Sequence, residues 1–136
     1  MIKLILGKKG SGKSKQIVEM ANKLVTEDKG DIVFIDDDKR YMYDLKHEIR
    51  FVNITEYDID DTSKFYGFVC GMLSQDFDIT HIFIDGIKNI LHKSLIEMEP
   101  LFNSLNAILR KNNVKAIIVM SVEPENVPDY VKQYID

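Results

Sequence analysis

The sequence predicts an α/β protein, a three-layer α/β/α sandwich built on a mainly parallel sheet. Two observations lead to this expectation: short runs of continuously apolar, β-forming residues recur along the chain, and segments with apolar residues at helical spacing separate them. Unbroken apolar runs are typical of strands that are buried on both faces, and helices between such strands provide the crossovers of a parallel sheet. Because the chain has 136 residues, we expect one domain spanning residues 1–136.

The first elements follow this pattern in order. A strand is predicted at Ile2–Leu6, where a glycine ends a short apolar run. A helix is predicted to begin at Lys13 and to stop at Lys29-Gly30, since glycine commonly follows the last helical turn. Ile32–Ile35 is rich in β-forming residues and predicts the next strand.

The middle of the chain carries weaker signals. Residues 39–47 are expected to form a helical turn or two, and Arg50–Ile54 a short strand at an edge of the sheet. A helix is predicted over Thr62–Asp76, because five apolar side chains fall on one helical face. Asp60, Asp61 and Thr62 are its candidate caps.

The last third alternates in the same way. The run Ile82–Ile84 predicts a strand that ends at Asp85, and Lys115–Ser121 predicts the last clear strand. Pro100 suits the first turn of a helix, which we expect to reach Lys111. The remaining expectations are a loop or short helix over Lys88–Glu99 and one helical turn at Tyr130–Tyr134.

Composition and charge limit the classes of function. The net charge is -4 and the pI is near 5.4, so no overall positive charge draws the chain to a nucleic acid, and nucleic acid is not an expected partner. No apolar run approaches the roughly 20 residues that cross a bilayer, and no membrane association is expected. The single Cys70 cannot form an internal disulfide, which fits a cytoplasmic location.

The most specific motif is Gly7–Ser14, with the sequence GKKGSGKS. It fills every fixed position of the phosphate-binding pattern G-x-x-x-x-G-K-[ST], and it lies between a predicted strand and a predicted helix, as that pattern requires. Glycines let successive backbone N–H groups surround an anion, and the start of the helix adds the positive end of its dipole. The alternative is a glycine-rich turn with surface lysines.

The loop therefore predicts which residues hold a polyphosphate. Lys13 is expected to reach the β and γ phosphates, with a catalytic role, while the hydroxyl of Ser14 is expected to bind Mg²⁺. A cluster of lysines marks this stretch in an otherwise acidic chain. The predicted nucleotide-binding residues here are Gly7, Lys8, Lys9, Gly10, Ser11, Gly12, Lys13, Ser14 and Lys15.

With this loop and with Ile82–Asp85, an apolar strand that ends in a carboxylate, the chain resembles the P-loop NTPases. The RecA-like branch is the most similar, and the resemblance covers roughly residues 2–122. It implies the P-loop NTPase fold, and it implies that Asp85 is the Walker B aspartate, which holds Mg²⁺ through water. The alternative for Asp85 is a helix or turn cap.

The resemblance extends to two further strand ends. VFIDDDKR (Val33–Arg40) is similar to the RecA strand that precedes the residue polarising the attacking water, and Asp38 takes that general-base position. KAIIVMSV is similar to the next strand, whose polar end residue senses the γ phosphate, and here that residue is Ser121. The alternatives are a solvated or metal-binding acidic turn at Asp36–Asp38 and an ordinary strand-end serine.

Two departures from the family pattern bear on catalysis. Gly86 follows Asp85 where many ATPases of the wider group have a glutamate, so the general base must come from elsewhere or be absent. None of the three arginines, Arg40, Arg50 and Arg110, has a spacing that identifies it as a finger supplied in cis. We therefore expect slow hydrolysis, accelerated when self-association or a protein partner supplies a basic residue.

The leading hypothesis is thus a minimal RecA-like domain that binds a nucleotide with Mg²⁺ and hydrolyses it slowly. Either ATP or GTP would serve, and the lack of a guanine-reading motif favours ATP. One alternative is a kinase that passes the γ phosphate to a small molecule, although the chain is poor in arginines. The other is a non-catalytic nucleotide-binding module that acts through interactions.

Overall fold

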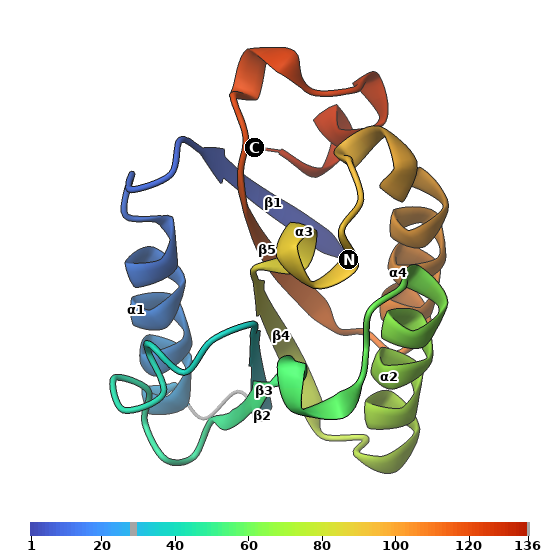
Figure 1. Cartoon of the computed structure of the whole chain (residues 1–136). Coiled ribbons are helices and arrows are strands. Elements are labelled where there is room, and N and C mark those ends of the chain that lie inside the picture. The colour runs from blue at the N-terminus through green and yellow to red at the C-terminus, as the bar shows by residue number, and fades with distance from the viewer. Residues whose placement is uncertain (28–29, 136) are drawn as a thin grey trace.

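Five parallel strands form one sheet between two helical layers in a computed structural model of the protein, which describes residues 1–27 and 30–135 (Figure 1). The spatial order is β1-β5-β4-β2-β3, and each neighbouring pair is parallel. This confirms the predicted three-layer α/β/α sandwich, with the short third strand at an edge. The strands are β1 (Ile2–Gly7), β2 (Asp31–Asp36), β3 (Arg50–Asn53), β4 (Ile79–Asp85) and β5 (Lys115–Ser121).

The helices cover both faces of the sheet. Helix α1 (Lys13–Thr26) covers one face, and α2 (Thr62–Gln75) and α4 (Glu99–Lys111) pack together on the other (Figure 1). The region predicted as a loop or short helix contains α3 (Ile87–Leu91) and the 3-10 turn η2 (Leu95–Met98), and another 3-10 turn, η1 (Ile54–Tyr57), follows β3.

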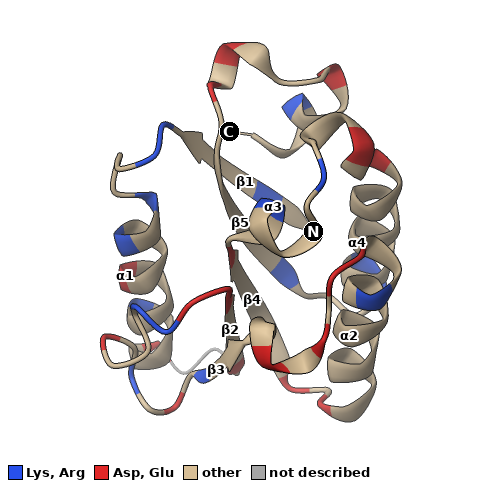
Figure 2. Cartoon of the chain, viewed as in Figure 1, with Lys and Arg blue, Asp and Glu red and all other residues tan. Residues whose placement is uncertain are grey.

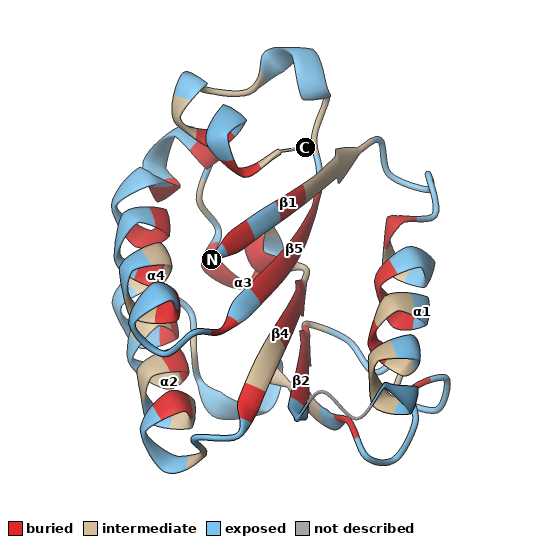
Figure 3. Cartoon of the chain, turned by 180° about the vertical axis from the view of Figure 1, so that it is seen from behind, coloured by how far each residue is buried: buried red, intermediate tan, exposed pale blue. Residues whose placement is uncertain are grey.

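The sheet is buried from both sides because successive strand residues point to opposite layers. Phe34 of β2 and Phe83 of β4 stack with ring centroids 6.0 Å apart. Both belong to a buried apolar cluster that also contains Ile17 of α1. The next residues along those strands, Ile35 and Ile84, belong to the larger cluster beneath α2 and α4. Figure 3 shows buried residues along the strands and on the inward sides of the helices. This two-sided burial explains the continuous apolar runs in the sequence.

The segment predicted to form a helical turn or two, residues 39–47, has no helix. It contains isolated turns, such as the hydrogen bond from the Met42 N–H to the Lys39 carbonyl at 3.1 Å. Asn22 of α1 holds the segment instead, because its side-chain oxygen accepts the Lys46 N–H at 2.8 Å and its amide donates to the Asp44 carbonyl at 2.9 Å. These contacts across the chain compete with the local hydrogen bonds of a helix.

The other boundaries lie close to the predictions. Asp61 is the cap of α2, and its carboxylate accepts the Lys64 N–H at 2.8 Å. Helix α4 begins one residue before Pro100 and ends at Lys111, as predicted. The predicted stop of the first helix falls partly on Lys29, which lies outside the described residues.

The end of the chain returns to the core. The predicted turn at its end is confirmed as the 3-10 helix η4 (Asp129–Tyr134), which follows another, η3 (Pro124–Asn126). The rings of Tyr130 and Tyr134 both meet Phe102 of α4 edge to face, and Ile135 forms a parallel bridge to Leu4 of β1. Across residues 1–27 and 30–135, no helix combines the length and apolar character that a bilayer crossing needs.

Candidate functional site

The loop between β1 and α1 has the backbone that its glycines predict. Gly10 and Gly12 adopt φ angles of +84° and +86°, a region that side chains rarely tolerate. The Ser11 N–H donates to the Lys8 carbonyl at 3.1 Å and closes a turn. Gly12 directly precedes the first residue of α1. The turn therefore leads straight into the positive end of a 14-residue helix.

Lys13 lies folded over this loop and is only 8% exposed. Its ammonium donates to the Lys8 carbonyl at 2.8 Å and to the Ser11 hydroxyl at 3.2 Å. Within the described residues, no carboxylate lies within ion-pair distance of it. The loop thus keeps one buried cation whose hydrogen bonds go to neutral oxygens, and such a cation is available to an anion.

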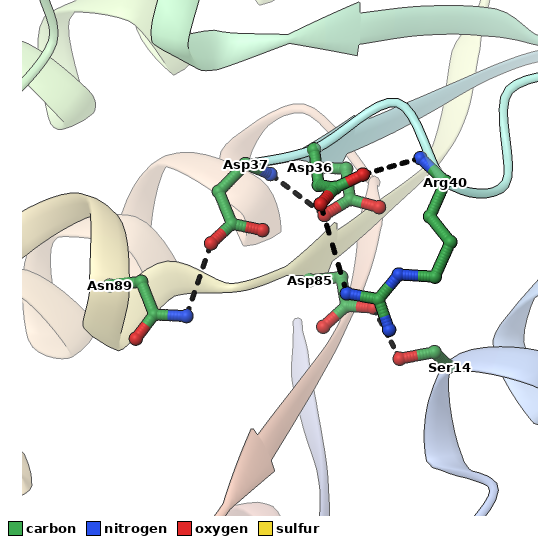
Figure 4. A network of polar contacts seen from close by, with 7 residues as sticks. Ser14, Asp36, Asp37, Arg40, Asp85 and Asn89 are labelled. Atoms are coloured by element: carbon green, nitrogen blue, oxygen red, sulfur yellow. Dashed lines mark hydrogen bonds and ion pairs between the residues drawn. The ribbon is translucent and has the colours of Figure 1, made fainter.

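Ser14 and Asp85 meet at the carboxyl end of the sheet. The Ser14 hydroxyl donates to a carboxylate oxygen of Asp85 at 2.5 Å, although Ser14 lies in the first turn of α1 and Asp85 ends β4 (Figure 4). A hydroxyl beside a carboxylate supplies the hard oxygen ligands that Mg²⁺ prefers. This pair is the part of the site best suited to hold a divalent cation.

Asp36 ends β2 beside Asp85 and is only 3% exposed. One of its oxygens accepts the Asp37 N–H at 2.7 Å. Burial raises the pKa of Asp36 to about 8, and the hydrogen bond with the Asp37 side chain and the negative charge of Asp85 add to the shift. At neutral pH this side chain is therefore mostly a neutral acid. Sequence reasoning treated Asp36 only as part of an acidic turn and missed its burial.

The three consecutive aspartates point to three different partners. Asp37 accepts a hydrogen bond from the Asn89 side chain at 3.1 Å and fills the space beside Gly86, where an added Cβ would lie 2.5 Å from its carboxylate (Figure 4). Asp38 is exposed, accepts the Arg40 N–H at 2.6 Å and lies 3.9 Å from the Arg40 guanidinium. Asp38, the predicted general base, is thus paired within its own loop.

A cavity of about 620 Å³ lies where these elements meet. Among the predicted site residues, it is lined by Lys9, Gly10, Gly12, Lys13, Ser14, Lys15, Asp38, Asp85 and Ser121. Gly7, Lys8 and Ser11 do not line it, although Gly7 pairs with Ser121 in the register of β1 and β5. The Lys8 ammonium lies 3.9 Å from Glu123, away from the cavity.

Residues to which the sequence assigned no role in the site also line the cavity. Arg40 and Tyr41 come from the loop after β2, and Lys88 and Asn89 from α3. Figure 2 shows basic positions at the start of α1 and acidic positions in the first part of the loop after β2. Because these side chains come from separate loops, no local sequence motif would have identified them as one group.

Comparison with known proteins gives a structural match and no sequence match. No family model matches the chain, and no curated protein matches it. Among solved structures, the chain is similar to the crystal structure of the RadB recombinase, with a TM-score of 0.56 and 14% sequence identity. The similarity covers 96% of this chain and 66% of that one. At this identity it shows that the two proteins share an α/β fold.

Proposed function

We propose that the protein binds ATP together with Mg²⁺ in the cavity between the Gly7–Ser14 loop and Asp85, and that it hydrolyses the nucleotide slowly. The observation that carries this proposal is the 2.5 Å hydrogen bond between Ser14 and Asp85. It joins the last residue of the phosphate-binding pattern to the carboxylate at the end of β4, and these two side chains would hold the metal ion beside the phosphates.

The residues present fit a polyphosphate. Lys13 is a buried ammonium at the start of a helix, and Lys9 and Lys15 line the same cavity. Mg²⁺ held by Ser14 and Asp85 would neutralise charge that develops on the phosphates. The fold shared with the RadB recombinase agrees with the proposal.

We assign activation of the attacking water to Asp38, as the RecA-like resemblance implies. Its carboxylate is paired with Arg40, and glycine rather than glutamate follows Asp85. Both features favour slow turnover of the isolated chain. We further propose that self-association or a protein partner that adds a basic residue to the cavity accelerates it.

Lys13→Ala tests the binding site. We expect it to abolish ATP binding measured by isothermal titration calorimetry in the presence of Mg²⁺, because the variant lacks the buried ammonium. Lys23→Ala is the matched control, since Lys23 lies on the same helix but is exposed and outside the cavity. Unchanged affinity in a folded Lys13→Ala protein would refute the site.

A nucleotide panel tests the reaction. Binding of ATP and GTP and release of inorganic phosphate are measured on the same sample at several protein concentrations. Slow phosphate release that rises with concentration supports the proposal, including its self-association. Binding without phosphate release would instead support a non-catalytic module, a reading favoured by the pairing of Asp38 with Arg40.

A further inference from the structure

We propose that Arg40 supplies a cation to the phosphates from within the same chain, and that it exchanges Asp38 for the phosphates when nucleotide binds. The inference rests on the proposed function of the cavity. It assigns a binding role to a residue that its sequence spacing does not identify.

The first support is the position of Arg40. It lines the cavity together with Lys13, Ser14 and Asp85, although it follows a different strand. In Figure 4 its side chain extends from the loop toward Ser14 and Asp85, and it remains 66% exposed. The loop after β2 therefore brings a guanidinium to the cavity. The loop after β1 and the start of α1 bring lysines to the same cavity.

The second support is that Arg40 is held weakly. Its guanidinium lies 3.9 Å from the Asp38 carboxylate, and the two side chains are 66% and 50% exposed. An exposed pair of this kind is weak, because solvent screens the two charges. The guanidinium also lies over the Tyr41 ring, 5.5 Å from its centroid, and a cation–π contact at an exposed site is weak as well. These contacts orient the side chain without fixing it.

The third support is the chemistry of the competing partner. A guanidinium binds phosphate through two parallel hydrogen bonds, which are shorter and about twice as strong as neutral ones. A polyphosphate in a cavity that four aspartates line also needs more positive charge nearby. Movement of the Arg40 guanidinium from Asp38 to a phosphate is therefore favourable. It would leave the Oδ2 oxygen of Asp38 without its cation.

The test compares Arg40→Ala with Lys39→Ala. Lys39 is the neighbouring residue, is exposed, lies 3.7 Å from Glu56 and does not line the cavity. Binding of AMP, ADP and ATP is measured by calorimetry with Mg²⁺. We expect Arg40→Ala to weaken ATP binding by about tenfold or more, with a loss that grows from AMP to ATP. Lys39→Ala should change none of the three affinities.

Arg40→Lys and Asp38→Asn sharpen the result. The lysine variant keeps the charge but loses the planar fork, so its affinity for ATP should fall between those of the wild type and Arg40→Ala. Asp38→Asn should strengthen ATP binding, and a double-mutant cycle with Arg40→Ala should show that the two effects are coupled.

The outcomes separate this inference from the proposed function. If Arg40→Ala binds ATP as well as Lys39→Ala does, or loses AMP and ATP affinity equally, the role of Arg40 is overturned while the site stands. If Lys13→Ala retains ATP binding, the proposed function itself fails. Thermal unfolding of each variant establishes that it is folded before its affinity is compared.

Discussion

The Ser14 hydroxyl donates a hydrogen bond to the Asp85 carboxylate at 2.5 Å, across 71 positions of sequence. The contact exists because β1 and β4 both pair with β5 in parallel, so the segments that leave their carboxyl ends meet at one edge of the sheet. This contact joins the start of α1 to the end of β4 and so brings the two sides of the candidate site together.

The first prediction concerns the metal. Ser14→Ala and Asp85→Asn should each weaken binding of ATP in the presence of Mg²⁺ by about tenfold or more, because the first removes the hydroxyl and the second removes the carboxylate charge that would hold the ion. Calorimetry with Mg²⁺ and with a chelator measures the difference. Ser104→Ala, at an exposed position of α4, is the control. Equal losses with and without Mg²⁺ would show that the pair does not hold the metal.

The second prediction concerns pH. The folded protein holds a proton on Asp36, whose pKa is raised to about 8 from 3.8, while the unfolded chain releases it. This residue's contribution to the free energy of unfolding is therefore fully present below about pH 4 and is lost as the pH rises toward about 8. Asp36→Asn is neutral at every pH. At pH 8 its free energy of unfolding should therefore exceed that of the wild type by on the order of a few kcal/mol.

Urea unfolding at several pH values between 4 and 8 checks this expectation. The Asp36→Asn protein should lose much of the decline in stability that the wild type shows over that interval. Asp38→Asn, at an exposed position two residues on, tests whether the effect depends on burial. A decline that is as steep in Asp36→Asn as in the wild type would mean that Asp36 is not the proton's site.

The third prediction concerns Gly86. Its φ is +80°, and an added Cβ would lie 2.5 Å from the Asp37 carboxylate. Gly86→Ala should lower the free energy of unfolding by about 1–3 kcal/mol, through backbone strain and the displacement of Asp37. Gly67→Ala is the control, because Gly67 lies in α2 with open space around it and should be neutral or slightly stabilising.

A double variant divides the cost at Gly86 into its two parts. Asp37→Ala in the Gly86→Ala background removes the steric conflict and leaves only the backbone strain. Chemical denaturation of the four proteins in this cycle gives the coupling energy. Additive effects would mean that Asp37 does not limit the residue at position 86.

The fourth prediction concerns the return of the chain to the core. The Tyr130 hydroxyl donates to the Leu95 carbonyl, and the Tyr130 ring meets Phe102 edge to face. Tyr130→Phe keeps the ring contact and loses the hydrogen bond, so it should destabilise the protein by about 0.5–1.5 kcal/mol. Urea midpoints at an unchanged slope measure the loss. Tyr43→Phe is the control and should have no effect, because Tyr43 is 90% exposed.

The sequence by itself determined where most strands and helices lie and that the strands run parallel. Runs such as Ile32–Ile35 predicted strands buried on both faces, and the alternation of strands and helices predicted a parallel sheet, because these patterns depend on local spacing. The glycines and Lys13 predicted the loop for the same reason, since a positive φ and a helix start are encoded within a few residues.

Only the tertiary structure decided how the three aspartates after β2 differ. Asp36 is buried at the end of β2, Asp37 turns to Gly86 and Asn89, and Asp38 turns to Arg40. In the sequence they are three identical letters in an exposed-looking turn. Their surroundings differ because Asp37 contacts residues that follow β4, whereas Asp38 contacts a residue of the loop after β2.

The same reason explains one difference from expectation and one contact that the sequence did not predict. Asn22 holds residues 44–46 in a loop, and the last turn packs on Phe102, through contacts between residues far apart in the chain. Propensity and periodicity report what a segment favours alone. Which side chains meet in a cavity depends on where the whole backbone brings them, because hydrogen bonds and burial act over a few ångströms in space regardless of separation in sequence.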